Sequence, residues 1–115
     1  MDLGPIGVWS FALRGGDRAQ ILETAAELEQ LGYTAIWFPG GQREGMAEHI
    51  EAVLGATKRI AVATGIVSIW TNPAETVGAE TAAIEAKYPG RYLLGLGVSH
   101  SMVVERSRLT YEKPL

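Results

Sequence analysis

Apolar and amphipathic segments alternate along this chain. Four short segments are rich in apolar, β-forming residues, and they predict strands over residues 6–11, 33–38, 60–67 and 92–98. Between them, apolar residues recur at the three- and four-residue spacing of a helix that buries one face. This spacing predicts helices over residues 19–31, 46–57 and 73–88. The predicted order is therefore strand then helix, three times over, followed by a fourth strand.

Residues that start and stop helices flank these segments. Asp17 is placed to cap the first helix, and Gly32 is placed to end it. Asn72, Pro73 and Glu75 predict the start of the third helix, with a cap, a proline at the first helical position and a carboxylate at the third. Short connections in a βα series favour a parallel sheet with sequential crossovers.

Two architectures share this order, an open doubly wound sheet and a slice of a (β/α)₈ barrel. The dinucleotide fingerprint G-x-G-x-x-G and the Walker phosphate loop are both absent after the first strand, where the chain reads Phe11–Asp17. A nucleotide-binding module therefore ranks last. Residues 99–115 show no clear period and are interpreted as a loop or mobile tail. We therefore expect a domain over residues 1–98 and a C-terminal tail over residues 99–115.

Composition narrows the function classes. The chain has 115 residues, of which 47% are hydrophobic and 20% charged, so a folded domain is expected rather than a disordered chain. It has no cysteine, which excludes disulfides, thiolate nucleophiles and cysteine-bound metals. A net charge of -3 gives no basic footprint for nucleic acid. No apolar run reaches the roughly 18 residues of a membrane helix, so we expect a cytoplasmic protein that binds no metal, nucleic acid or membrane.

Candidate chemistry gathers where the predicted strands end. Ligands bind at the carboxyl ends of parallel strands in both architectures, and Trp9, Trp37 and Trp70 all fall there. Together they predict either a site for a flat aromatic ring or three large core residues. Gly95 and Gly97 lie two apart on the fourth strand, which indicates close approach by a ligand or tight packing within a narrow barrel.

Two histidines are read differently. His100 directly follows the fourth strand, where it is either an ordinary polar loop residue or a group that bonds a ligand or relays a proton. His49 stands between Glu48 and Glu51 in a helical segment and is interpreted as a surface residue. No group of His, Asp and Glu residues has the spacing of metal ligands.

Four stretches of the sequence together resemble one family: Gly7–Ser10, Leu31–Pro39, Thr64–Glu75 and, most specifically, Tyr88–His100. Over essentially its whole length the chain resembles the luciferase-like monooxygenase superfamily. Tyr88–His100 resembles the branch that uses the deazaflavin coenzyme F-420, and relatives that use FMN share the same strands. The resemblance implies a (β/α)₈ barrel, which takes about 250 residues. We therefore expect the N-terminal half of one: an α/β fold in which a (βα)₃β unit has parallel strands in the order 1-2-3-4 and helices on one outer face.

The resemblance also implies a site, position by position. A non-prolyl cis peptide is expected at Gly65–Ile66, behind the coenzyme ring. The implied coenzyme-binding residues are Gly65, Ile66, Gly97, Ser99 and His100, and the implied substrate pocket is formed by Trp9, Ser10 and Trp37. His100, which follows the fourth strand, is the one catalytic candidate. The chain departs from the family at residues 38–41, which read Phe-Pro-Gly-Gly where several deazaflavin enzymes carry an acid–histidine pair that donates a proton.

The implied activity is that of an oxidoreductase that uses coenzyme F-420, or alternatively FMN, for hydride transfer or monooxygenation of a small organic molecule. An alternative comes from the predicted half-barrel itself. Exposed strand edges and an uncovered apolar interior favour self-association, so a non-catalytic half-barrel that is stable as a homo-oligomer is the second hypothesis.

Overall fold

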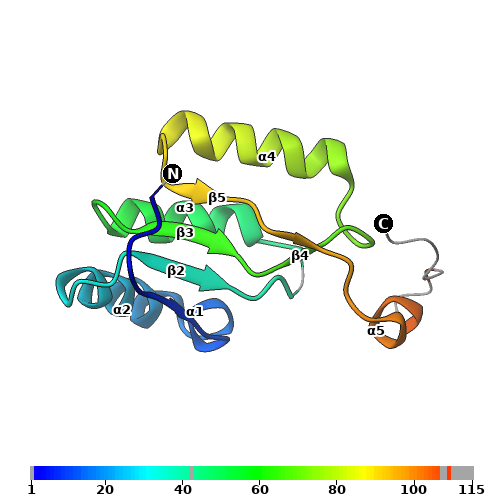
Figure 1. Ribbon diagram of the computed structural model, residues 1–115, viewed down its shortest axis with the longest axis horizontal. Helices are drawn as coiled ribbons and strands as arrows, with labels where there is room; N and C mark the ends of the chain where they lie inside the picture. The colour runs from blue at the N-terminus through cyan, green and yellow to red at the C-terminus, as the bar shows by residue number, and fades with distance from the viewer. Residues whose placement is uncertain (1, 42, 107–108, 110–115) are drawn as a thin grey trace.

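The computed structural model describes residues 2–41, 43–106 and 109. Its strands are β1 (Gly7–Trp9), β2 (Ala35–Phe38), β3 (Ala61–Thr64), β4 (Val67–Ser68), β5 (Tyr92–Leu93) and β6 (Leu96–Gly97). Its helices are α1 (Ala12–Gly15), α2 (Arg18–Gln30), α3 (Met46–Ala56), α4 (Ala74–Lys87) and α5 (Ser101–Arg106) (Figure 1). The predicted third and fourth strands are thus each divided into two short pieces.

The strands pair in the order of the sequence. The larger sheet has the order β1-β2-β3-β5, all parallel, and β4 and β6 continue it as a parallel pair. Trp9 lies opposite Trp37, which lies opposite Ala63, which lies opposite Leu93. The predicted order 1-2-3-4 of a (βα)₃β unit is confirmed.

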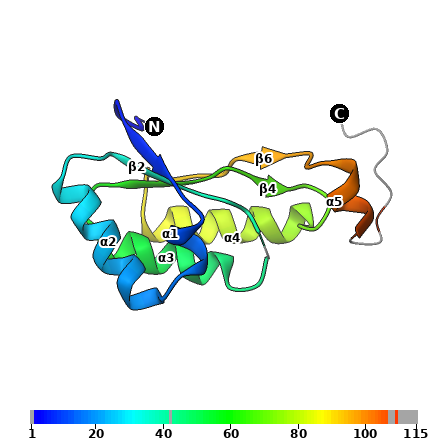
Figure 2. The same cartoon turned by 90° about the horizontal axis from the view of Figure 1, so that it is seen from below.

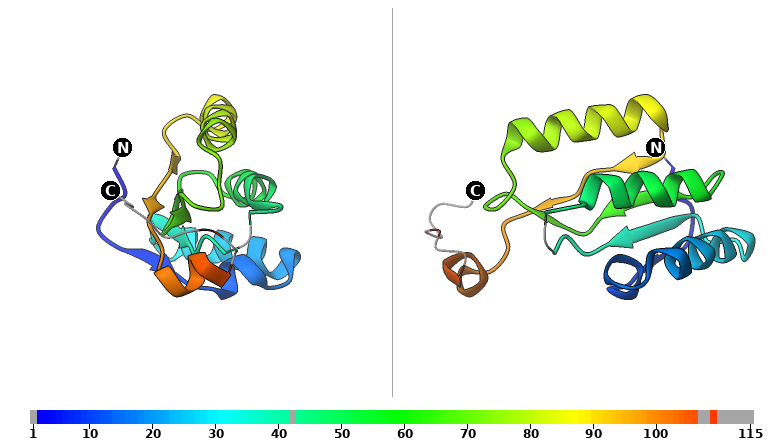
Figure 3. Two further views of the ribbon diagram at one scale, coloured as in Figure 1. Left: turned by 90° about the vertical axis from the view of Figure 1, so that its right-hand side faces the viewer. Right: turned by 180° about the vertical axis from the view of Figure 1, so that it is seen from behind.

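The helices α1 to α4 all lie on one side of the sheet (Figure 2). Figure 3 shows the same arrangement end-on, with α2, α3 and α4 fanned around the outside of the curved strands. A doubly wound sheet would place helices on both faces, so this layering confirms the barrel-type alternative. The opposite face of the sheet, here called the inner face, carries no helix from α1 to α4.

The core lies between the sheet and these helices. Alternation along each strand sends Ile36, Val62 and Tyr92 toward the helices, where they pack with buried residues of α2, α3 and α4. The inner face receives the other set of side chains, which are mostly small: Gly7, Ala35, Ala61 and Ala63, together with Trp9, Trp37 and Leu93. Two ion pairs, Arg43–Glu80 and Lys87–Glu51, each 2.7 Å long, connect α4 to the loop before α3 and to α3 itself.

The helix starts differ in how well the sequence predicts them. Asp17 caps α2 as predicted, because its side chain accepts a hydrogen bond from Gln20 N at 3.1 Å. The cap predicted at Asn72 is wrong. Pro73 occupies the cap position of α4, and the Asn72 amide instead donates to the carbonyl oxygen of Ser68 at 2.9 Å.

Two short helices were not predicted. Helix α1 begins directly after β1, because the Ser10 hydroxyl accepts from Ala12 N at 3.1 Å and starts a turn. Residues 101–106 form α5 where a loop was expected, so that part of the interpretation is wrong. Residues 107–108 and 110–115 of the predicted tail lie outside the described residues, and the division at residue 98 stays a prediction.

His49 is buried rather than exposed, which corrects the surface interpretation. Only 2% of its surface is accessible, and its Nε2 lies 2.7 Å from the Leu13 carbonyl oxygen. Because a carbonyl only accepts, Nε2 carries the proton and donates it. The imidazole also packs against the Phe38 ring at 4.9 Å between centroids. His49 therefore ties α3 to α1 and, through α1, to the end of β1.

Glu29 lies at the amino-terminal end of the sheet, where the strands begin. Its carboxylate accepts hydrogen bonds from the backbone N–H groups of Lys58, Arg59 and Ile60, at 2.6 to 3.1 Å. Burial works to raise the pKa of Glu29, but these three donors outweigh it, so that the pKa lies below its ordinary value of 4.5. Ionised Glu29 therefore holds α2 against the chain that enters β3.

We expect Glu29→Gln to lower the free energy of unfolding by about 1 kcal/mol at neutral pH, because an uncharged amide oxygen accepts these backbone hydrogen bonds less strongly than a carboxylate does. The stabilisation is complete above pH 4.5, the ordinary pKa of the unfolded carboxyl, and is lost as the pH falls through the lower folded-state pKa. Urea unfolding at several pH values measures this. The variant should lose part of the acid sensitivity, whereas Glu27→Gln on the same helix removes an equal charge but none of these three bonds and should cost less stability at neutral pH.

Candidate functional site

The inner face brings Trp9, Trp37 and Gly65 together. The Trp9 indole Nε1 donates a hydrogen bond to the Gly65 carbonyl oxygen at 3.0 Å. A Cβ placed on Gly65 would lie 3.4 Å from Trp37 Cε3 and 3.5 Å from Trp9 Cδ1, so both indoles border the backbone at this point. Half of the Trp9 surface is exposed, at 50%. Two of the three predicted tryptophans therefore form one group around the end of β3.

The backbone changes direction at the next residue. The peptide bond between Gly65 and Ile66 is cis, as the resemblance implied. Ile66 is 39% exposed, and its side chain lies over Gly97, where an added Cβ would stand 2.6 Å from Ile66 Cδ1. On the other side, an added Cβ on Gly40 would collide with the Ile66 carbonyl oxygen. Gly97 in β6 therefore leaves room for the Ile66 side chain, and Gly40, in the loop after β2, leaves room for the Ile66 carbonyl.

Gly95 and Thr64 form a second close approach. The Thr64 hydroxyl accepts from Gly95 N at 2.8 Å and donates to Gly95 O at 3.0 Å, and an added Cβ on Gly95 would collide with the Thr64 carbonyl oxygen. Of the two explanations for the paired glycines, tight packing accounts for the contacts at both Gly95 and Gly97 in this structure. The packing in turn fixes where Ile66 stands.

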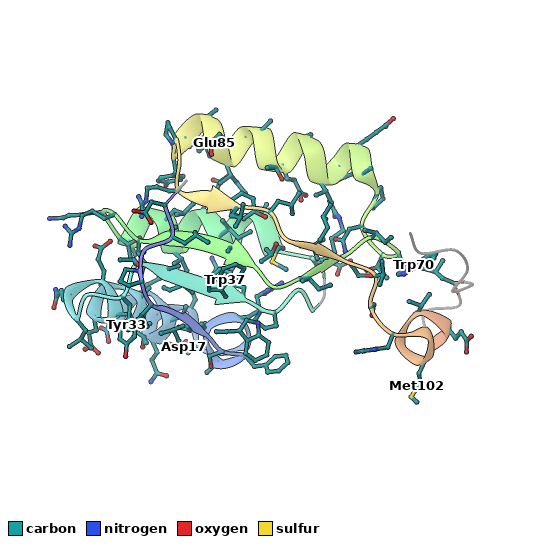
Figure 4. The ribbon with its side chains drawn as sticks, in the orientation of Figure 1. Asp17, Tyr33, Trp37, Trp70, Glu85 and Met102 are labelled. Carbon is teal, nitrogen blue, oxygen red and sulfur yellow. The ribbon has the colours of Figure 1, made fainter. Side chains whose placement is uncertain are left out.

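Trp70 lies apart from this group. Figure 4 shows Trp37 over the strands, whereas Trp70 lies beyond β4, near the end of the molecule that holds α5. The Trp70 indole Nε1 donates to the Val98 carbonyl oxygen at 2.7 Å. Trp70 therefore holds the chain as it leaves β6 and takes no part in the group that Trp9 and Trp37 form around Gly65.

Ser99 and His100 form the turn after β6. Ser99 has a left-handed backbone with φ 57°, and the His100 carbonyl oxygen accepts from Val104 N at 3.0 Å at the start of α5. The His100 residue is exposed. Ser10, at the end of β1, is half-buried and uses its hydroxyl oxygen to start α1. The turn thus places the one histidine candidate at the carboxyl end of the sheet.

Sequence reasoning did not single out Thr64, Gly40 or Phe11. Phe11 is 68% exposed, and its ring stands edge-on to Trp9 at 4.9 Å between centroids. Its position two residues after Trp9 is the signal that was available, because both residues stand at the carboxyl end of the first predicted strand. Thr64 and Gly40 carry no such signal, since their role depends on contacts between strands.

The group around Ile66 is aromatic, aliphatic and uncharged. Its polar atoms are backbone groups and the hydroxyl of Thr64, and Ser99 and His100 follow at the turn after β6. Among the described residues, no cluster of three or more His, Asp or Glu side chains is arranged to hold a metal ion. Nor does any helix in the described part of the chain have the length and apolar character needed to cross a membrane. The arrangement suits contact with a flat ring more than it suits metal or hydrolytic chemistry.

Comparison with known proteins decides the family. The sequence profile of the luciferase-like monooxygenases matches residues 5–115. The chain belongs to that family. A search of curated protein sequences gave no match for this luciferase-like chain.

Among solved structures, the luciferase-like chain is similar to the crystal structure of the monooxygenase RslO1 from Streptomyces bottropensis. The two superpose with a TM-score of 0.74 at 16% sequence identity, over 90% of this chain. At that identity the likeness establishes the fold. The superposed part is 36% of the RslO1 chain, so this luciferase-like chain spans well under half of that structure.

Proposed function

We propose that this chain supplies the ring-binding wall of an oxidoreductase that acts on a small organic molecule with coenzyme F-420, or alternatively with FMN. The observation that supports the proposal is the position of the Ile66 side chain. The exposed Ile66 side chain stands over Gly97 on the inner face, at the carboxyl end of the sheet. Gly40 lies against the Ile66 backbone carbonyl, and Trp9 borders the preceding residue, Gly65. The resemblance of Tyr88–His100 to the deazaflavin branch favours coenzyme F-420 over FMN.

The residues present fit such a ring. Ile66 offers an apolar support for one face of a planar system, and Trp9 and Trp37 border the space beside it. Gly65, Gly97, Ser99 and His100 are assigned to the polar edge of the ring, where backbone groups and two short side chains are available. Trp9, Ser10 and Trp37 are assigned to the substrate side.

When bound, the coenzyme ring supplies the hydride, or in the FMN case activates oxygen. The chain's own residues position the ring and exclude water. The Trp9 hydrogen bond to the Gly65 carbonyl oxygen holds the backbone from which Ile66 projects. His100 is the candidate to hold or deliver a proton at its imidazole, because the loop over residues 38–41 contains no titratable side chain.

Titration of the chain with coenzyme F-420 and, separately, with FMN tests this assignment. We expect saturable quenching of tryptophan fluorescence by one of the two, because Trp9 and Trp37 border the proposed site. Gly97→Ala should displace the Ile66 side chain and weaken that binding by about tenfold, which corresponds to about 1.4 kcal/mol. His100→Ala should also weaken binding while leaving the thermal midpoint nearly unchanged.

Gly78→Ala is the matched control, because a Cβ on Gly78 in α4 would meet no atom within 4 Å. It should leave coenzyme binding unchanged. Failure of both coenzymes to bind, or equal binding by wild type and Gly97→Ala, would contradict the proposed site. A cytoplasmic location is part of the same proposal.

A further inference from the structure

The chain takes one residue more between β3 and β4 than its neighbour takes between β5 and β6. The last aligned pair of β3 and β5 is Ala63 with Leu93. The first aligned pair of β4 and β6 is Val67 with Leu96. The chain therefore advances four residues on one side and three on the other. A strand with an extra residue bends, and bends of this kind re-aim side chains next to active sites. Ile66 lies within the bend.

The Thr64 side chain holds the start of this bend. Its hydroxyl accepts from the Gly95 N–H at 2.8 Å and donates to the Gly95 carbonyl oxygen at 3.0 Å. The same carbonyl oxygen accepts from Val67 N at 2.8 Å. Gly65 and Ile66 therefore stand between two residues that are both bonded to one atom of the neighbouring segment.

Thr64 is a polar residue in an apolar position. The other residues of β3 are Ala61, Val62 and Ala63, and Thr64 is as deeply buried as they are, with 0% of its surface exposed. A buried hydroxyl is costly unless it is hydrogen-bonded, and the Gly95 peptide supplies both partners. These contacts join segments that pair within this chain, so they do not depend on what lies beyond either edge of the sheet.

We propose that Thr64 is a positioning residue for the candidate site, because its hydroxyl holds the bend that places the Ile66 side chain over Gly97. Thr64 spends both hydrogen bonds on Gly95 and acts on a bound ring only through Ile66. The inference rests on the proposed function for the role of Ile66 as an apolar support of the coenzyme ring. Without the hydroxyl, the Val67 bond alone would tie the bend to Gly95.

Thr64→Val tests the proposal, because valine has nearly the same shape and lacks the hydroxyl. In the coenzyme-free wild type we expect a nuclear Overhauser effect (NOE) between the Ile66 δ-methyl protons and the Gly97 α-protons, because a Cβ on Gly97 would stand 2.6 Å from Ile66 Cδ1. Thr64→Val should lose this NOE and should bind the coenzyme about tenfold more weakly. Thr64→Ser keeps the hydroxyl and should behave as the wild type in both measurements.

Thr57→Val is the matched control. Thr57 is also buried, at 7% exposed, and its hydroxyl also has two partners: it donates to the Val53 carbonyl oxygen at 2.8 Å and accepts from Arg91 Nη2 at 2.7 Å. Thr57 precedes β3 and so lies at the opposite, amino-terminal end of the sheet. Thr57→Val should lower the thermal midpoint and leave the NOE and coenzyme binding unchanged. A merely structural role for Thr64 predicts this same result for Thr64→Val.

The NOE separates this proposal from the proposed function. If neither coenzyme binds the wild type, the proposed function fails, and loss of the NOE in Thr64→Val but not in Thr57→Val still supports the positioning role. An NOE that is absent from the wild type, or that persists in Thr64→Val, would overturn the proposal. So would equal coenzyme binding by the wild type and Thr64→Val. Loss of the NOE in Thr64→Ser would overturn it as well, so the test does not depend on the folding of Thr64→Val.

Discussion

Gly95→Ala is expected to lower the free energy of unfolding by about 3 kcal/mol or more. The new Cβ would collide with the Thr64 carbonyl oxygen, which is backbone. That backbone has little freedom to move, because Gly95 is bonded to the Thr64 hydroxyl and its own carbonyl accepts from Val67 N at 2.8 Å. Relief would require breaking the sheet where β3 and β5 give way to β4 and β6.

Thermal or urea unfolding measures the effect, and a loss of this size should lower the thermal midpoint by about 10–20 °C. Gly78→Ala is again the control. Gly78 lies inside α4 with open space around it, so alanine should stabilise the protein by about 0.5–1 kcal/mol through helix propensity. Equal stability of Gly95→Ala and wild type would show that the two backbones are not held at this distance in solution.

His49→Ala should cost about 2–4 kcal/mol, because the substitution opens a cavity beside Phe38 and removes the donor to the buried Leu13 carbonyl. His49→Gln keeps an N–H donor on a side chain of similar reach and should cost less. A loss of equal size in both variants would indicate that ring packing, rather than the hydrogen bond, carries the contribution of His49.

His49 also makes stability depend on pH. Burial lowers the pKa of the imidazole below its ordinary value of 6.5, the Leu13 bond opposes this, and the positive charges of Arg14 and Arg18 lower the pKa further. As the pH falls below 6.5, unfolded His49 takes up a proton that native His49 resists, so the free energy of unfolding falls until the pH has passed the native pKa. Urea unfolding between neutral pH and about pH 5 should show this slope in wild type and a flatter one in His49→Gln. Parallel curves would contradict it.

The sheet was predictable because its signals are local. Apolar runs locate every strand, and Asp17 caps α2 through its own side chain. The interruptions in the third and fourth strands were harder to predict from the sequence, because they arise where Thr64 bonds to Gly95, 31 residues away. The residue pattern along one strand does not show which residue of the neighbouring strand it will contact.

The error at His49 has a different origin. Its neighbours Glu48 and Glu51 indicated a surface position. His49 nevertheless lies three residues after Met46 and four before Val53, which are both buried residues of α3. Helical geometry places these three residues on one face. The polarity of adjacent residues is therefore a poorer guide to burial than the helix face that a residue occupies. A buried histidine is tolerated when a carbonyl such as that of Leu13 accepts a hydrogen bond from its ring N–H.

The residues of the candidate site could be predicted only in part from the sequence. The cis peptide at Gly65–Ile66 was expected from the family resemblance, and the structure places Trp9 and Trp37 beside it. Trp70 looked equivalent to them because it too follows a predicted strand. Its indole instead bonds to Val98, a contact 28 residues away that depends on how β4 and β6 pair.

The sequential strand order has a consequence for how the chain is made. Aligned partners are separated by 28, 26 and 30 residues, for Gly7 with Ala35, Ala35 with Ala61, and Val62 with Tyr92. The entropy lost in closing each loop is therefore nearly the same at every step. A chain emerging from the ribosome can add one strand and its helix at a time to an edge that is already formed, without waiting for its last residues to be synthesised.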